Sequence, residues 1–170
     1  MATNVLITGA PGTGKTSLIK HLMHDLTPLV LKGFYKEEIY ENQTCKGFRT
    51  ITFDLNEQIL AHVYIEAPHR IGSYGVNIDG FEKLVLPQFT SLEGVELIII
   101  DEIGRMECLS SQFCDKLTDI LDSKVPLIAT LDPIVLDKFE NLQKRSDVSI
   151  MWINRKNRHE LWKNVILELD

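Results

Sequence analysis

Apolar and polar residues follow two different periods along this chain, and these periods separate short runs from longer amphipathic stretches. Short apolar runs bounded by polar or glycine-rich segments predict strands over residues 5–8, 32–40, 46–53, 59–65, 95–101, 125–131 and 149–153. Apolar residues at helical spacing predict helices over residues 18–26, 81–87, 110–122, 134–142 and 157–169. Segment 67–80 contains three glycines and a proline, which is typical of a loop.

Strands that alternate with helices predict an α/β fold, in which three layers are built around a mostly parallel sheet. Residues 32–65 differ, because three strand runs follow one another with only the turn-rich segments ENQT and DLNEQ between them. These runs predict antiparallel hairpin strands at one edge of the sheet, although neither segment has the two-residue Asn-Gly signal. The chain has 170 residues and no repeat, low-complexity tract or linker, so we expect residues 1–170 to form a single domain.

The segment GAPGTGKTS lies between the first predicted strand and the first predicted helix. Its Gly9-x-x-x-x-Gly14-Lys15-Thr16 pattern is that of a P-loop, in the strand-to-helix context that this motif requires. Glycines let backbone N–H groups surround a phosphate, while Lys15 reaches the β- and γ-phosphates and Thr16 binds Mg²⁺. The alternative is a glycine turn with a capping threonine, but the context favours a P-loop NTPase domain that binds a nucleoside triphosphate. The predicted nucleotide-binding residues here are Gly9, Ala10, Pro11, Gly12, Thr13, Gly14, Lys15, Thr16 and Ser17.

The apolar run 95–101 ends in Asp101, and Glu102 follows directly. Because P-loop proteins hold Mg²⁺ through water with an acid at this place, we predict that Asp101 and Thr16 bind the metal and that both acids belong to the nucleotide site. Glu102 would polarise a water molecule for attack on the γ-phosphorus, which a hydrolase needs and a kinase does not. The alternative is a solvated acidic pair that starts a loop or caps a helix. Glu107 is expected near the same rim, in a catalytic or a structural role.

Several arginines are further candidates for contact with the nucleotide. Arg70 lies in the glycine-bearing segment and would reach the γ-phosphate like an arginine finger, so we group it with Lys15 and Glu102 as a catalytic residue. The alternative for Arg70 is an ion pair with an acid of the hairpin region. The basic cluster 155–158 includes Arg158, which we predict to bind nucleotide, although an exposed helix start is also consistent with the cluster. Arg105 is expected to be solvated.

Five blocks of the sequence stand out beyond the P-loop pattern: GAPGTGKTSLI (9–19), GFYKEEIYENQTCKGF (33–48), RIGSYGVNIDGFEKLVLP (70–87), DEIGRME (101–107) and NR (157–158). Together they resemble the THEP-type and cancer-related nucleoside-triphosphatases of thermophiles and animals. The resemblance covers nearly the whole chain in the same order, and DEIGRME is far more specific than an acid-ended strand.

The resemblance implies a fold like that of P-loop nucleotide kinases and Mg²⁺-dependent hydrolysis of ATP, GTP, CTP and UTP, with slow turnover and little base preference. It also implies that Gly9–Thr16 binds phosphate and that Leu97–Gly104 forms a second nucleotide segment. Three residues depart from the family pattern. Lys36 replaces a threonine, Tyr40 an arginine and His159 an aspartate, so any roles of the replaced side chains do not carry over.

Composition limits the partners and the compartment. The net charge of −6 argues against a general nucleic-acid binder, and no stretch approaches the length of a membrane span. Cys45, Cys108 and Cys114 have no metal-ligand spacing, which fits unpaired thiols in a reducing compartment. The N-terminus lacks a signal-peptide layout, so the predicted location is cytoplasmic. The one predicted partner is the nucleoside triphosphate; we predict no membrane, nucleic-acid or protein partner.

Two other functions remain open at this point. A nucleotide or nucleoside kinase needs an acceptor pocket and a basic lid, but residues 34–80 hold only Arg49 and Arg70. A nucleotide-dependent switch or binding module would use hydrolysis as a timer, and no residue pattern excludes it. The NKxD signature of switch GTPases is absent from the sequence.

Overall fold

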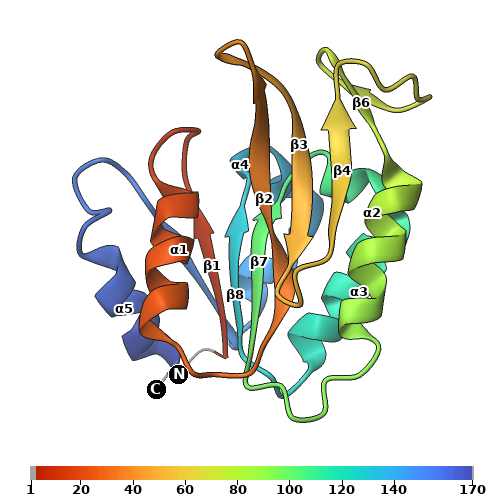
Figure 1. The fold of residues 1–170 in the computed structure, drawn as a ribbon. Helices are drawn as coiled ribbons and strands as arrows, with labels where there is room; N and C mark the ends of the chain where they lie inside the picture. The colour runs from red at the N-terminus through yellow and green to blue at the C-terminus, as the bar shows by residue number, and fades with distance from the viewer. Residues whose placement is uncertain (1–2, 170) are drawn as a thin grey trace.

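The computed structural model describes residues 3–169, and within them nine strands form one mixed sheet of order β5-β6-β4-β3-β2-β7-β8-β1-β9 (Figure 1). Helices cover both faces, so the predicted three-layer α/β fold is confirmed. No helix in residues 3–169 is both long and apolar enough to cross a membrane. The strands are β1 (Asn4–Thr8), β2 (Leu31–Glu41), β3 (Thr44–Thr52), β4 (Glu57–His62), β5 (Arg70–Ile71), β6 (Tyr74–Val76), β7 (Leu97–Ile103), β8 (Leu127–Leu131) and β9 (Val148–Trp152).

One half of the sheet is parallel and brings several strand ends to the same edge. β7 pairs in parallel with β2 and β8, and β1 pairs in parallel with β8 and β9. The register sets Asp101 of β7 opposite Tyr35 of β2, and Thr8 of β1 opposite Leu131 of β8. In open α/β sheets ligands bind outside the carboxyl ends of the strands. The loop after β1 and the acids of β7 therefore lie together at the edge where a ligand is expected.

The other half of the sheet is antiparallel, as the successive strand runs predicted. β2 and β3 form a hairpin that rises above the parallel half in Figure 1. Its turn consists of Asn42 and Gln43, whose φ angles of 49° and 64° are both positive, as a type I′ turn requires. The two-residue turn is thus present without an Asn-Gly pair. β2 is long enough to pair with β7 in its first half and to extend past the carboxyl edge in its second half.

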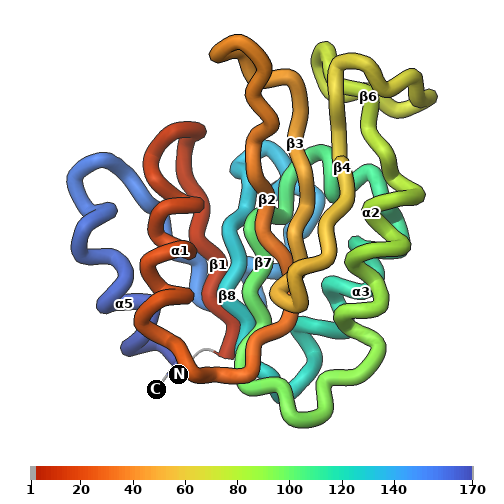
Figure 2. Tube along the Cα trace, in the orientation of Figure 1, coloured from red at the N-terminus to blue at the C-terminus, as the bar shows by residue number. Residues whose placement is uncertain are grey.

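Apolar helix faces complete the outer layers (Figures 1 and 2). Leu18, Ile19 and Leu22 of the first helix pack with the last helix on one face of the sheet. Phe81 and Phe113 pack edge-to-face at 5.3 Å on the opposite face, within the larger apolar cluster. The helices are α1 (Lys15–Asp25), α2 (Ile78–Val85), α3 (Ser111–Asp122), α4 (Pro133–Leu136) and α5 (Leu161–Leu169).

Helix α1 differs from its neighbours at its N-terminus. Side chains cap α2 and α3, where Asn77 accepts from the Gly80 N–H and Ser110 accepts from the Phe113 N–H, both at 3.0 Å. Helix α1 has Gly14 at this position, with φ of 102° and no side-chain cap. Its first N–H groups are consequently left for a ligand, as a phosphate loop needs.

Most element boundaries shift by one to three residues, and three segments differ further from the sequence predictions. Segment 67–80 is not only loop: it contains the β5–β6 hairpin and the start of α2. The helix predicted over 134–142 stops at Leu136 and continues as 3₁₀ turns. The helix predicted from residue 157 begins at Leu161, because the Asn154 side chain accepts from the Lys156 and Asn157 N–H groups and holds a turn there.

We expect Gly33→Ala to destabilise the fold strongly. Gly33 lies in β2 with φ of +117°, and a Cβ there would collide with the carbonyl oxygen of Ile99 in β7. Backbone strain of about 1–2 kcal/mol and overpacking of about 1–3 kcal/mol predict a loss of about 2–5 kcal/mol in the free energy of unfolding, measured in urea. Gly94→Ala is the control, because its φ is +72° but a Cβ there would meet nothing within 4 Å in residues 3–169 apart from its chain neighbours, so only the strain remains. Equal losses in both variants would contradict the packing argument.

Candidate active site

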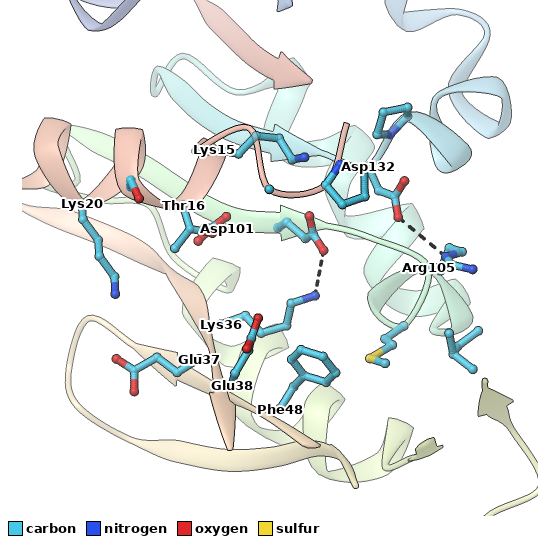
Figure 3. Close-up of a pocket in the computed structure, with 18 of the residues that line it drawn as sticks. Lys15, Thr16, Lys20, Lys36, Glu37, Glu38, Phe48, Asp101, Arg105 and Asp132 are labelled. Carbon is cyan, nitrogen blue, oxygen red and sulfur yellow. Dashed lines mark hydrogen bonds and ion pairs between the residues drawn. The ribbon is translucent and has the colours of Figure 1, made fainter. Parts of the chain in front are cut away.

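A cavity of about 880 Å³ opens at the carboxyl edge of the sheet, between the loop after β1, the end of β7 and the β2–β3 hairpin (Figure 3). Charged groups of both signs line it, and an apolar wall closes its far side. The cations are Lys15, Lys20, Lys36, Arg105 and Arg158. The acids are Glu37, Glu38, Asp101, Glu102 and Asp132, and the apolar wall includes Phe48, Ile71 and Met106.

The glycine loop already has the shape of a phosphate site. Lys15 Nζ folds back over the loop and donates to the carbonyl oxygens of Gly9 at 2.7 Å and Ala10 at 3.2 Å. A Cβ at Gly9 would collide with the carbonyl of Ile153, so this position requires glycine. The loop thus presents backbone N–H groups and one ammonium to the same space, an arrangement suited to the phosphates of a nucleotide.

Asp101 is 2% exposed, and its Oδ2 has no hydrogen-bond partner among residues 3–169. Its Oδ1 accepts from the Thr130 hydroxyl at 2.6 Å, and the Thr16 hydroxyl lies close to the same carboxylate. Burial raises the pKa of Asp101, and the two hydroxyls oppose that rise. A carboxylate beside a hydroxyl at the phosphate loop is an oxygen donor set that fits a hard divalent cation such as Mg²⁺.

Lys36 joins the two glutamates of the DEIGRME segment. Its Nζ lies 2.8 Å from Glu102 Oε1 and 3.0 Å from Glu107 Oε1. Burial alone lowers the pKa of Lys36, but Glu107 and Glu102 outweigh it and hold the pKa above its ordinary value, so the ammonium stays charged. Glu107 is fully buried, whereas the Glu102 side chain remains 25% exposed and borders the cavity.

The structure brings most of the predicted site residues together. Most of the loop residues line the cavity with Asp101 and Glu102, while Gly9, Ala10 and Thr13 form the loop backbone behind them. The Arg158 Cδ would lie 3.6 Å from a Cβ placed on Gly14, so this side chain lies beside the loop. Their roles in binding and catalysis stay predictions.

Arg70 does not line the cavity. Its guanidinium donates to the carbonyl oxygens of Ile65 at 3.2 Å and Ser73 at 2.6 Å, within its own loop. These partners are backbone groups rather than an acid of the hairpin region. A role as an arginine finger stays a prediction, and it would require both hydrogen bonds to break.

Six charged residues of the cavity were not predicted as site residues: Lys20, Lys36, Glu37, Glu38, Arg105 and Asp132. Arg105, expected to be solvated, is 52% exposed but lines the cavity, with Nε 3.7 Å from Asp132 Oδ2. Asp132 directly follows β8, so it could have been predicted as a site residue from its place at the carboxyl end of a parallel strand. Lys20 is one helical turn beyond Thr16. Lys36 gave no such signal, because its position opposite Glu102 depends on the pairing of β2 with β7.

Comparison with known proteins gives consistent matches over the length of the chain. A family model described as NTPase matches residues 4–166. The nucleoside-triphosphatase THEP1 of Thermotoga maritima is 40% identical over 167 residues, which cover 95% of this chain and 92% of that protein. The human cancer-related nucleoside-triphosphatase is 30% identical, with 98% and 96% covered.

Solved structures agree with these matches. The crystal structure of THEP1 from Aquifex aeolicus superposes with a TM-score of 0.86 at 29% identity, over 98% of this chain and 99% of that one. The solution structure of a human cancer-related nucleoside triphosphatase gives a TM-score of 0.81 at 30% identity, over 96% and 95%.

We expect Asp101→Asn to stabilise the fold while it impairs the site. Because burial raises the folded-state pKa of Asp101 above 3.8, the ionised carboxylate opposes folding at pH 7, and this cost vanishes as the pH falls below the unfolded-state pKa. In EDTA the variant should melt at a higher temperature than the wild type at pH 7, with a difference that shrinks towards about pH 4. Thermal melts across this pH range measure it. A lower melting temperature at pH 7 would contradict the assignment of an unfavourable buried charge.

Proposed function

This chain belongs to the nucleoside-triphosphatase family, and from that membership we propose that it is a Mg²⁺-dependent hydrolase. In this proposal it converts ATP, GTP, CTP and UTP to the nucleoside diphosphate and phosphate, slowly and with little base preference. Hydrolysis of nucleoside triphosphates follows from the family itself. One observation carries the finer proposal: the phosphate loop and the Asp101–Glu102 pair line the same cavity.

The phosphates supply most of the binding energy in this proposal. The β- and γ-phosphates lie in the loop over the open N-terminus of α1, and Lys15 leaves its carbonyl partners to pair with them. Lys20, Arg105 and Arg158 add positive charge around the same space. Thr16 and Asp101 would hold Mg²⁺, and a bound ion would supply positive charge to offset the charge that develops during the reaction.

Water attacks the γ-phosphorus in line with the leaving diphosphate. The water oxygen forms the new bond to phosphorus, the bridging P–O bond breaks, and its electron pair leaves with the nucleoside diphosphate. Glu102 orients the water and accepts its proton. The Lys15 ammonium stabilises the charge on the transferring oxygens, because it is fixed beside them before the reaction.

Phosphoryl transfer to a small acceptor is the second candidate function, and part of the lining of the cavity supports it. The wall away from the phosphate loop includes Tyr40, Phe48 and Ile71, which would suit a planar acceptor ring. Phosphate release with and without nucleoside or monophosphate acceptors separates the two reactions. Release at full rate without an acceptor supports the hydrolase. Nucleoside diphosphate that forms only with an acceptor, together with a phosphorylated acceptor and no free phosphate, would replace it with a kinase.

We further propose that residues 1–170 act as one domain, and that the protein is cytoplasmic. Both stay predictions from length and from the three cysteines without metal-ligand spacing. No nucleic-acid, membrane or protein partner is included in the proposal.

Glu102→Gln should lower kcat by about 10²–10⁴-fold, because the water loses its proton acceptor. Affinity for Mg²⁺ and nucleotide should be retained, since Glu102 holds neither the loop nor Asp101. Steady-state phosphate release and a binding titration measure the two effects. Glu57→Gln is a matched control, because Glu57 also forms an ion pair, with Arg49 at 3.7 Å, but lies outside the cavity. Lost affinity with a high residual rate would make Glu102 a metal-site residue instead.

The four nucleoside triphosphates should give kcat/KM values within about 100-fold of one another. Strong discrimination requires buried polar groups that the wrong base leaves unpaired, and no asparagine, glutamine or histidine lines the cavity within residues 3–169. Arg158 acts by charge or stacking, which tolerates any base. A phosphate-release assay with each nucleotide tests this. A preference of about 10⁴-fold or more for one base, as a hydrogen-bonding pocket achieves, would overturn the broad specificity.

A further inference from the structure

Lys36 has an unusual position for a lysine on a β-strand beside an open cavity. Its side chain is only 16% exposed, and Nζ lies 5.4 Å from the centroid of the Phe48 ring. From there the ammonium contacts Glu102 on the cavity side and Glu107 on the core side, as described above. Figure 3 shows Lys36 reaching from β2 towards the end of β7. Two carboxylates therefore share one buried cation at the edge of the reaction space.

Glu107 provides the fixed end of this arrangement. Its carboxylate is fully buried, and Oε2 has no hydrogen-bond partner in residues 3–169, so Lys36 is the cation that compensates its charge. Removing a partner from such a buried pair is costly, which keeps Lys36 in place. Gly104 allows the two carboxylates to approach, since a Cβ there would lie 2.8 Å from Glu107 Oε2 and 3.0 Å from Glu102 Oε1.

Glu102 is the exposed end, with 25% of its side chain accessible. A partly exposed glutamate samples several rotamers, and a misplaced general base loses much of its effect because proton transfer requires hydrogen-bond distance. Lys36 donates to Glu102 Oε1 at 2.8 Å. This contact restricts the carboxylate and leaves Oε2 as the oxygen available to a water molecule.

We propose that Lys36 is the positioning residue of Glu102: anchored by Glu107, it holds Glu102 Oε1 so that Oε2 can accept the proton of the attacking water. The inference rests on the proposed function, in which Glu102 orients that water. The competing account is that Lys36 only neutralises the buried charge of Glu107 and is irrelevant to the rate.

Lys36→Met should lower kcat by about 10–100-fold, on the scale of a misplaced catalytic group, with KM for MgATP changed by less than about threefold. Lys36→Arg should recover most of the rate, because a guanidinium can also donate to both carboxylates. Lys32→Met is the matched control: Lys32 lies on the same strand but donates to the Ser91 carbonyl, outside the cavity. A higher KM at unchanged kcat, or no rescue by arginine, would overturn the proposal.

A second variant separates an effect on folding from an effect on catalysis. Lys36→Met leaves Glu107 buried without a cation, so its melting temperature should fall, and adding Glu107→Gln should restore much of it. In the stabilised double variant kcat should remain as low as in Lys36→Met. Recovery of the wild-type kcat would show that Lys36 only neutralises Glu107, and would overturn the positioning role.

A double-mutant cycle with Glu102 gives the sharpest result. If Lys36 acts through Glu102, then Lys36→Met should cause no further loss of kcat in the Glu102→Gln background. An undiminished loss there would overturn the proposal. Different results would contradict the proposed function itself. These are a wild type that releases no phosphate unless an acceptor is present, or a Glu102→Gln variant whose kcat is unchanged.

Discussion

Parallel strands end at a common edge, and this constraint determines where the charged groups of the cavity lie. β7 is held between β2 and β8 by parallel pairing, and β1 lies on the far side of β8. The phosphate loop after β1 and the Asp101–Glu102 pair of β7 therefore meet, although they are far apart in sequence. The antiparallel hairpin extends β2 past the same edge and adds Lys36 and Phe48 to the cavity.

The groups that serve the site oppose the stability of the fold. Asp101 and Glu107 are buried carboxylates, and burial raises the pKa of each. Each also has one oxygen without a protein partner in the described part of the chain. Buried charges of this kind are rarely the most stable choice at a position, and proteins commonly retain them where binding or catalysis needs them. Asp101 fits a cation at the phosphate loop, and Glu107 anchors the only cation that contacts Glu102 within residues 3–169.

Local sequence predicted the parts of the site that are local in the chain. Gly9–Thr16 form one contiguous turn whose glycines and lysine are recognisable without the rest of the fold, and Asp101 follows from the end of an apolar run. Lys36 was noticed only as a departure from a family pattern, because its contact with Glu102 arises from pairing between strands 66 residues apart. Arg70 illustrates the reverse case, since a glycine-bearing loop suggested a free arginine where backbone carbonyls hold the guanidinium.

The same distinction holds for the secondary structure. Buried strands and amphipathic helices were predictable from their periods, and the sheet contains all seven predicted strands. The errors fell at boundaries controlled by side-chain hydrogen bonds, such as the Asn154 turn that delays α5, and in the two short strands β5 and β6. Such elements have too few residues to show a period.

Hydrolysis in water enriched in ¹⁸O tests the central claim most directly. The account predicts that each turnover without an acceptor places one solvent oxygen in the inorganic phosphate and none in the nucleoside diphosphate, because water attacks the γ-phosphorus. Mass spectrometry of both products measures the label. Solvent oxygen in the nucleotide product, or transfer of the γ-phosphate to an acceptor with no inorganic phosphate formed in its absence, would contradict it.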